Sequence, residues 1–398
     1  MEKKRYGSKL IIVILALLLI LAVFLYNKVG FPQKISMIEP SDSREYRIKG
    51  TKFFENGEYQ KALETFSKAA ELYPSHLTLN GIASSYRELK NYKEAIKYYK
   101  KSLEWEPNFY DTYRMLGLTY YLNRDFSAAI DTFKKAIEID PNNPLAYNGI
   151  GSSYRELGDF KTASEYYNKS LSLDPDNEET SHVIGVLRYY LGDYVGAKRY
   201  LNFIPNRENW NQNFYLLLSH MQTSDIDPII QITDKLKEAT PNDKNVYSFA
   251  GAAYILKNQP KLAIENYKKS VELTEDADKS RLHYNSMGLS MAYLLDKNYG
   301  QAFNSINDAL GYDISGDAFL TLAVYYDLTG DNKNYEYYIQ KTKTLGVSVT
   351  TFEILGKVYL HQNSYEKAEK IYLLGLEYYP GNEMLKRGLL KSSLRKNE

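Results

Sequence analysis

From residue 43 onward, apolar residues recur at spacings of three and four along most of the chain. One such stretch carries Ala129, Ile130, Phe133, Ala136 and Ile137, a spacing that puts apolar side chains on one face of an α-helix. Proline recurs near the ends of these segments, where it can close one helix and open the next. The pattern predicts an all-α chain of consecutive helix–turn–helix units.

The same pattern repeats with a period near 34 residues. The blocks NGIASSYREL (80–89) and NGIGSSYREL (148–157) match at all but one position and lie 68 residues apart, which is two periods. A fixed period in this range is typical of a solenoid, in which each unit buries its apolar face against its neighbours. Ten units begin at Ser43, His76, Tyr110, Pro144, Glu178, Trp210, Lys244, His283, Gly316 and Val349.

Within the units, certain positions keep one kind of side chain. Position 8 is small in nine of the ten units, position 20 is alanine in eight, and position 11 is aromatic in eight. Small residues at these positions would let two helices approach closely, with the aromatic ring beside the contact. On these positions the chain resembles the tetratricopeptide repeat (TPR) family, specifically a membrane-anchored bacterial member.

The resemblance implies a right-handed α-solenoid of about ten TPR units over residues 43–380, followed by a capping helix at 381–398. Repeats 5, 6, 8 and 9 depart most from the family pattern. An insertion around residues 274–281 precedes the eighth unit, so that either the superhelix bends there or the register shifts by a few residues.

Residues 10–27 form a transmembrane signal-anchor candidate. The run from Leu10 to Tyr26 has no charge, proline or glycine, and as a helix it nearly spans the ~30 Å hydrocarbon layer of a bilayer. The alternative is a cleaved signal peptide, but no small-x-small cleavage site follows the run. Residues 1–9 form a basic flank and residues 28–42 a short stalk, so the lipid bilayer is one expected partner.

Basic residues at the two ends of this segment predict its orientation. The N-terminal flank holds Lys3, Lys4, Arg5 and Lys9, whereas Lys28 and Lys34 follow the other end. The positive-inside bias favours a cytoplasmic N-terminus, with the repeat array outside the cytoplasm of a bacterium. A secreted array after cleavage, or an array inside the cytoplasm, would be the alternatives.

Composition narrows the function classes. Lys and Arg number 50 against 49 Asp and Glu, so no overall positive field favours nucleic acid. Cysteine is absent and the five histidines are scattered singly, which excludes thiol chemistry and gives no support to a metal site. No phosphate-binding glycine loop or nucleophile elbow occurs. We therefore expect a non-enzymatic protein with no catalytic residues, no metal and no cofactor.

The resemblance implies that positions 2, 5, 9 and 12 of each first helix line a concave groove that binds a protein or peptide. In repeats 1–4 these positions carry a polar stripe with four arginines: Arg47, Asn80, Ser84, Arg87, Arg114, Tyr121, Asn148, Ser152 and Arg155. Guanidinium groups beside amides and hydroxyls suit a carboxylate or an acidic peptide. The alternative is a solvated helix face with local Asp111–Arg114 and Arg155–Asp159 ion pairs.

In repeats 7–9 the same positions are apolar: Ala252, Ile255, Met287, Met291, Leu294, Leu320 and Val324. Exposed, they would form a groove for an apolar peptide or helix. The helical spacing of Met and Leu favours the alternative that they belong to the core.

Tyrosine is the most abundant aromatic residue, with 39 copies. Sixteen of these copies occupy positions 11, 17 or 24 and have packing roles, and the remainder suit wet binding surfaces. The predicted function is a membrane-anchored scaffold or adaptor that binds a protein partner. An extracytoplasmic receptor for a glycan or small ligand, and an accessory subunit of an envelope enzyme or assembly complex, are the alternatives.

Overall fold

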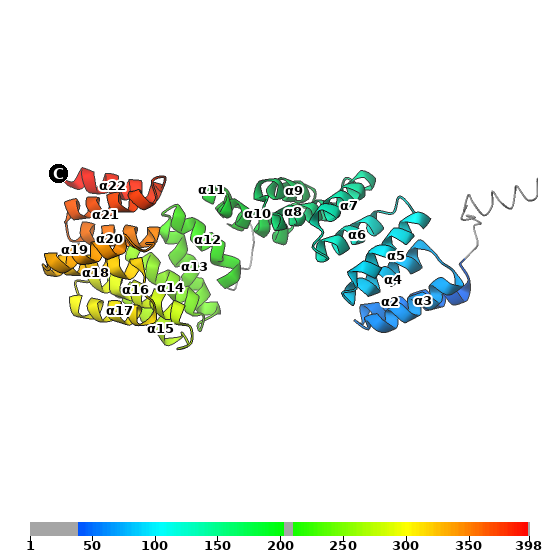
Figure 1. The fold of residues 1–398 in the computed structure, drawn as a ribbon, viewed down its shortest axis with the longest axis horizontal. Coiled ribbons are helices and arrows are strands. Elements are labelled where there is room, and N and C mark those ends of the chain that lie inside the picture. Colours follow the sequence, from blue (N-terminus) through cyan, green and yellow to red (C-terminus); the bar gives the residue numbers. More distant parts are fainter. Residues whose placement is uncertain (1–38, 203–209, 397–398) are drawn as a thin grey trace, which may run out of the picture. The chain divides into compact units, whose positions relative to one another are not determined.

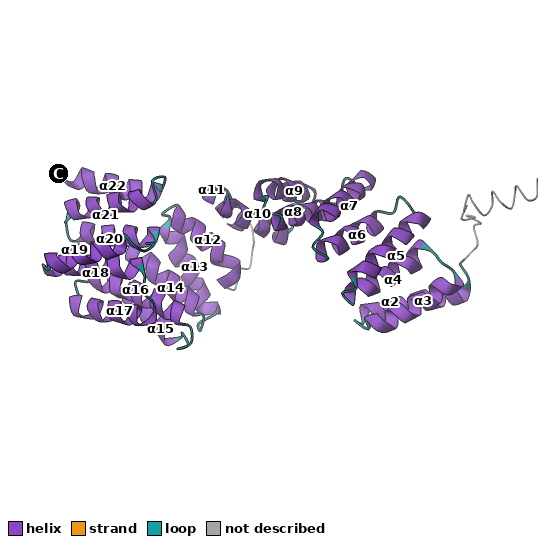
Figure 2. Ribbon diagram, in the orientation of Figure 1, coloured by secondary structure: helices purple, strands orange, loops and turns teal. Residues whose placement is uncertain are grey.

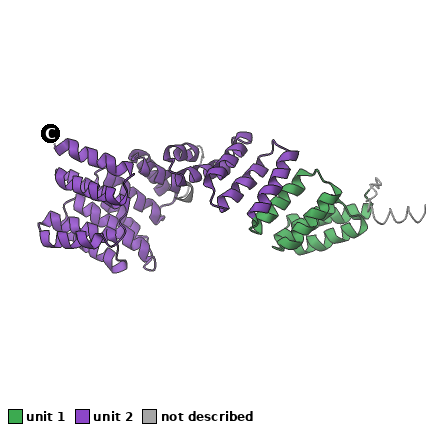
Figure 3. Cartoon of the chain, turned by 45° about the horizontal axis from the view of Figure 1, so that its top comes forward, with its two compact units in different colours: residues 1–125 green, residues 126–398 purple. Residues whose placement is uncertain are grey.

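The computed structural model describes residues 39–202 and 210–396, which contain 21 α-helices and no strand (Figure 2). Two compact units divide the chain at residue 125 (Figure 3). The predicted anchor at 10–27 and its basic flank at 1–9 lie outside the described residues. Among the helices described, none combines the length and the apolar character that crossing a membrane requires.

The first unit holds five helices in its described part. They are α2 (Ser41–Glu55), α3 (Tyr59–Leu72), α4 (His76–Glu88), α5 (Tyr92–Trp105) and α6 (Tyr110–Leu122). Consecutive helices pack as antiparallel pairs, and the first helices α2, α4 and α6 lie side by side (Figure 1). This alternation is the predicted helix–turn–helix arrangement.

The second unit continues with sixteen helices in its described part. They are α7 (Phe126–Ile139), α8 (Pro144–Glu156), α9 (Phe160–Leu173), α10 (Glu178–Tyr190), α11 (Tyr194–Asn202), α12 (Trp210–Gln222), α13 (Ile226–Ala239), α14 (Lys244–Leu256), α15 (Pro260–Glu272), α16 (Lys279–Leu295), α17 (Tyr299–Tyr312), α18 (Gly316–Thr329), α19 (Asn332–Thr342), α20 (Val349–His361), α21 (Tyr365–Tyr378) and α22 (Glu383–Lys396). The all-α solenoid predicted from the repeat is confirmed.

In eight of the ten repeats the first helix begins at the predicted residue, which confirms the predicted register there. In the first repeat, helix α2 begins at Ser41, two residues before the predicted start at Ser43. In the eighth repeat α16 begins four residues early, at Lys279, while the turn residue Lys297 keeps the register predicted from His283. The Asp278 side chain accepts a hydrogen bond from the backbone N–H of Arg281 and so caps an extra helical turn, which absorbs the end of the insertion.

The turn between the two helices of a repeat has the same backbone conformation in all ten repeats. The fifteenth residue, counted from each predicted unit start, adopts a positive φ. Four of these residues are glycines, and the other six are Lys90, Arg124, Ser224, Asn258, Lys297 and Asn363. Because an L-residue is strained in this region, the conformation is imposed by the helix pair.

The small residue at position 8 does let two helices approach closely. A Cβ atom added to Gly151 would lie 2.9 Å from the ring of Tyr167 on the paired helix. At Gly356 the added Cβ would lie 2.3 Å from the ring of Tyr372. A large ring at position 24, not the predicted aromatic residue at position 11, therefore fills the space that the glycine leaves.

In the C-terminal part of the second unit, the first helices pack on one another. One continuous apolar core runs from α14 to α22, and α20 contacts α14, α16 and α18. The Lys357 ammonium donates to the Leu256 carbonyl at 3.4 Å, and the Gln362 amide donates to the Leu294 carbonyl at 3.3 Å. The inner side of these repeats is therefore filled by the chain itself.

Helix α22 closes this core as the predicted cap. Met384 and Leu385 are buried, whereas Leu390 and Leu394 are 60% and 59% exposed. The leucines of this helix are therefore only partly buried.

Candidate functional site

The predicted polar stripe lies on the first helix of each repeat. In the first compact unit, residues 1–125, its uncharged side chains form hydrogen bonds to other helices. The Asn80 amide donates to the Thr112 hydroxyl at 2.7 Å, linking α4 to α6. The Ser84 and Tyr99 hydroxyls lie 2.8 Å apart, linking α4 to α5. Burial of Tyr99 raises the pKa of its phenol. These side chains stabilise contacts between helices, and Tyr121 is partly buried on α6.

The arginines of the first unit already have partners. Arg47 makes a bidentate ion pair with Glu39 at 3.0 and 3.1 Å, which lowers the pKa of that carboxyl. The Arg87 side chain is only 10% exposed and donates to Glu88 at 2.6 Å. Its NH1 group also lies 2.9 Å from the sulfur of Met115.

The Arg114 guanidinium pairs with Asp111 at 3.2 Å, as the local-pairing alternative predicts. The arginine side chains of the first unit are therefore neutralised and between 10% and 25% exposed.

The second unit repeats the neutral bonds at the matching positions. The Asn148 amide donates to the Thr180 hydroxyl at 3.0 Å, and the Ser152 hydroxyl lies 2.8 Å from that of Tyr167. Arg155 pairs with Glu156 at 3.1 Å and is 37% exposed, more than any arginine of the stripe in the first unit.

The predicted Arg155–Asp159 alternative finds no support here, because Asp159 caps α9. Its carboxylate accepts a hydrogen bond from the backbone N–H of Thr162, and that contact lowers its pKa.

The apolar stripe of repeats 7–9 is core, as its spacing favoured. All seven of its residues are at most 4% exposed: Ala252, Ile255, Met287, Met291, Leu294, Leu320 and Val324. They belong to the core that joins α14 to α22. A groove for an apolar peptide on this stripe is therefore excluded in this structure.

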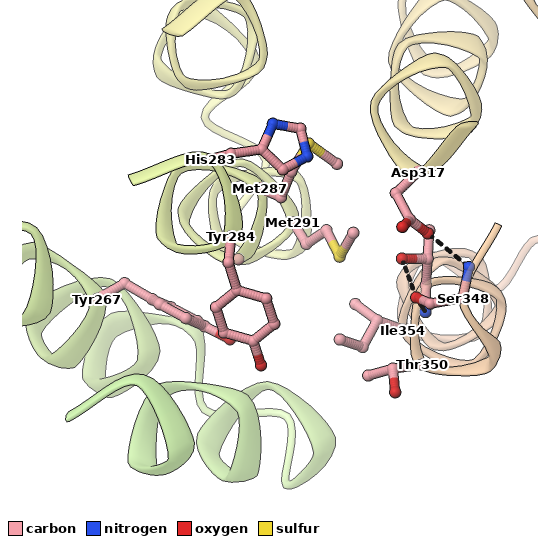
Figure 4. Close-up of a pocket in the computed structure, with 11 residues that line it drawn as sticks. Tyr267, His283, Tyr284, Met287, Met291, Asp317, Ser348, Thr350 and Ile354 are labelled. Atoms are coloured by element: carbon pink, nitrogen blue, oxygen red, sulfur yellow. Dashed lines mark hydrogen bonds between the residues drawn. The ribbon is translucent and has the colours of Figure 1, made fainter. Parts of the chain in front are cut away.

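A pocket of about 80 Å³ nevertheless opens beside this core, within the second unit. Helices α15 and α16 form one wall, and α18 and α20 form the other, as Figure 4 shows. The first wall holds Tyr267, His283, Tyr284, Met287 and Met291, and the second holds Asp317, Ser348, Thr350 and Ile354.

The sequence pattern marked only the two methionines of this pocket. Tyr267 occupies a packing position, Tyr284 lies in the extended α16, and Asp317 lies in the first turn of α18. Only the curvature of the repeats brings the two walls together. Across residues 39–202 and 210–396, no cluster of three acidic or histidine side chains could hold a metal ion.

Comparison with known proteins identifies the repeat. Family models described as tetratricopeptide repeat match residues 49–105, 75–142, 144–177, 245–276 and 350–382. Anaphase-promoting complex subunit 6 of Arabidopsis thaliana is 34% identical over 98 residues, which are 23% of this chain and 18% of that protein. The chain therefore spans less than a fifth of the length of this curated relative.

Solved structures of repeat proteins also align with the chain. The C-terminal part of a TPR repeat-containing protein from Cytophaga hutchinsonii is 20% identical, covers 69% of this chain and 99% of its own, and has a TM-score of 0.44. MamA, from residue 41 to its end, of Desulfovibrio magneticus RS-1 is 17% identical, covers 42% of this chain and 94% of its own, and has a TM-score of 0.39. With the family matches and the paired helices taken together, the chain is a tetratricopeptide repeat protein.

Proposed function

We propose that this tetratricopeptide repeat scaffold binds a protein partner on the first-helix face of its N-terminal repeats, while residues 10–27 hold it in a membrane. The choice of face rests on one observation. In repeats 7–9 the first-helix stripe is buried, with at most 4% exposure, whereas in repeats 1–4 the arginines keep 10% to 37%. The stripe of repeats 1–4 is therefore the more accessible of the two.

The paired arginines suit exchange of a partner rather than permanent binding. An exposed ion pair contributes little to stability, typically ~0–1 kcal/mol, so Arg155 can leave Glu156 at low cost. A carboxylate of an incoming protein could then pair with the guanidinium through two parallel hydrogen bonds. Arg155 is the best placed for this exchange because it is the most exposed of the four.

The test compares Arg155→Glu with Lys169→Glu, an exposed position on the second helix of the same repeat. Partners are captured by crosslinking to the full chain in its native membrane and then identified. We expect Arg155→Glu to weaken capture about tenfold, as loss of one important interface residue does, and Lys169→Glu to leave it unchanged. Equal capture by both variants, with helix content intact, would overturn the proposed face.

We further propose a single-pass topology with a cytoplasmic N-terminus and the repeats outside. The support is the uncharged run of residues 10–26 and the excess of basic residues before it. Protease added to intact spheroplasts should digest residues beyond 43, and protection of these residues would reverse the orientation. A cleaved signal would appear as a mature chain that lacks residues 10–27.

A second candidate function is binding of a glycan, because tyrosines gather at the surface of the second unit. Tyr190 is 57% exposed, and its hydroxyl lies 2.8 Å from that of Tyr215. The rings of Tyr189 and Tyr194 lie close by. Exposed aromatic rings with polar tips suit sugar surfaces, so a glycan array with a Tyr190→Ala control would test this role. Uniformly flat responses on the array would eliminate it.

A further inference from the structure

Four repeats carry a buried tyrosine at position 24. In one of these repeats the tyrosine hydroxyl has no hydrogen-bond partner. Tyr99, Tyr167, Tyr267 and Tyr372 are each at most 3% exposed. The hydroxyls of Tyr99 and Tyr167 bond to Ser84 and Ser152, and that of Tyr372 lies 3.5 Å from the Glu353 carbonyl. Within the described part of the chain, the Tyr267 hydroxyl has no hydrogen-bond partner.

The missing partner has a visible cause in the sequence. Ser84 and Ser152 both occupy position 9 of their units, and in the seventh unit position 9 is Ala252. Because burial without a partner disfavours the phenolate, the pKa of Tyr267 lies well above its usual value. The chain thus keeps a protonated hydroxyl that nothing in the fold satisfies.

This hydroxyl lines the pocket of about 80 Å³ described above. Figure 4 shows the rings of Tyr267 and Tyr284 directed into the pocket from one wall. The side chains of Met287, Met291 and Ile354 supply an apolar lining, and each of these residues is only 3–4% exposed. A ligand here would meet an apolar surface next to an unsatisfied hydroxyl.

The charge of the pocket selects the ligand. Asp317 is an acid in its lining, and no lysine or arginine lines the pocket. One oxygen of Asp317 accepts the backbone N–H of Ser348 at 2.8 Å, whereas no described cation forms an ion pair with the carboxylate.

Both ring nitrogens of His283 have partners within the fold. Its Nδ1 atom lies 2.9 Å from the carbonyl of Ala309, so Nδ1 carries the proton and donates it. Its Nε2 atom, 3.1 Å from the Ser315 hydroxyl, can then accept, as a neutral imidazole does. With His283 neutral, Asp317 is the one formal charge among the residues that line the pocket, and this favours a cation.

We propose that this pocket binds the side chain of a lysine from a partner protein. Its aliphatic stem would lie on the methionines, and its ammonium would reach the Asp317 carboxylate and the Tyr267 hydroxyl. Tyrosine rings attract a cation placed over them, and a carboxylate ligand would be repelled by Asp317. The volume equals on the order of six water-sized occupants, which matches the five non-hydrogen atoms beyond Cα of a lysine. This proposal rests on the proposed role as a protein-binding scaffold.

The direct test uses n-butylammonium as the probe and the full chain in detergent micelles. The chain has seven methionines, so methyl-labelled methionine gives a simple NMR spectrum. We expect saturable shifts of the Met287 and Met291 methyls, while Met115 and Met384 stay unchanged. Butyrate and n-butanol serve as the anionic and neutral probes of equal length. Absent shifts, or equal shifts with butyrate or butanol, would overturn the proposal.

Three variants assign the contacts. Asp317→Asn keeps the acceptor for the Ser348 N–H but removes the charge, and it should weaken butylammonium binding about tenfold. Tyr267→Phe removes one oxygen and should weaken binding about threefold. Ala252→Ser rebuilds the serine–tyrosine hydrogen bond that is present in the second and fourth repeats. It should therefore stabilise the fold and also weaken binding. Unchanged binding in Asp317→Asn would show that the pocket does not select a cation.

The probe experiment separates this inference from the scaffold function. If partners are captured but butylammonium shifts nothing, the scaffold stands and the lysine pocket is wrong. If butylammonium binds as described and capture from the membrane yields no protein, the scaffold function fails and the pocket takes an alkylammonium from another source.

Discussion

The Ser84 hydroxyl lies 2.8 Å from the Tyr99 hydroxyl, and Ser152 and Tyr167 repeat that distance one pair of units later. Each bond joins the two helices of one unit in a site that is almost dry, since Tyr99 is fully buried. The serines that were predicted to contact a ligand therefore also hold together the two helices of their repeat.

Replacing Ser84 with alanine should therefore destabilise the protein. The Tyr99 hydroxyl would lose its short bond and keep only the 3.5 Å contact from Arg87, at a cost of about 1–2 kcal/mol. Combining Ser84→Ala with Tyr99→Phe should cost less than the two single changes added together, because both partners are then removed. Urea denaturation of the four proteins measures the coupling, and strict additivity would show that the bond contributes nothing.

Adding a methyl group at Gly356 should be strongly unfavourable. Its Cβ would lie 2.3 Å from the ring of Tyr372, which is buried and cannot move away. We expect Gly356→Ala to cost about 2 kcal/mol, as overpacking does. Gly300 is the matched control, because it is also helical and nothing lies within 4 Å of its added Cβ. Gly300→Ala should stabilise by up to ~1 kcal/mol, and equal melting shifts would contradict the packing explanation.

The strained turn residue Lys90 offers a stabilising change. Its φ of 60° is unfavourable for any residue with a Cβ atom, so Lys90→Gly should raise the free energy of unfolding by about 0.5–1 kcal/mol. Lys93→Gly, inside α5 and equally exposed, should instead lose about 1 kcal/mol. Chemical denaturation distinguishes the two variants by the opposite sign of their effects.

The ion pair between Glu353 and Lys357 is a vulnerable point of the C-terminal core. The Glu353 side chain is 6% exposed, and one of its oxygens bonds only to the Lys357 ammonium at 3.1 Å while the other has no partner. Lys357→Met would leave a buried carboxylate without compensation, at a cost of about 3 kcal/mol. Adding Glu353→Gln should recover most of that loss. If the double variant is less stable than Lys357→Met, this explanation is wrong.

Stability at the start of the array should depend on pH through Glu39. Its hydrogen bonds and ion pair with Arg47 hold its pKa below the ordinary value near 4.5. The pair therefore stabilises the fold above pH ~4.5, and this contribution is lost as the pH falls through the lowered pKa. Glu39→Gln should weaken hydrogen-exchange protection of α2 at pH 7 and have little effect near pH 3. Glu45→Gln, exposed on the same helix, should behave like the wild type at both pH values.

The polar stripe shows how much of a candidate site a repeat pattern can predict. The pattern put Asn80, Ser84 and Arg87 on the first helices, and the structure has them there. It did not reveal that the first two already form hydrogen bonds with Thr112 and Tyr99. Hydrogen bonding depends on which side chains the next helix presents, and that requires the angle between helices.

The sequence alone determined the local structure, because a period near 34 with small residues at positions 8 and 20 permits few other packings. It foresaw eight of the ten first-helix starts and the close approach of two helices at small residues such as Gly151. Only the tertiary structure decided that α20 contacts α14 and that Tyr267 faces a pocket with Asp317 opposite. The physical reason is that the curvature of a solenoid sums small rotations between many neighbours, and no local pattern contains that sum.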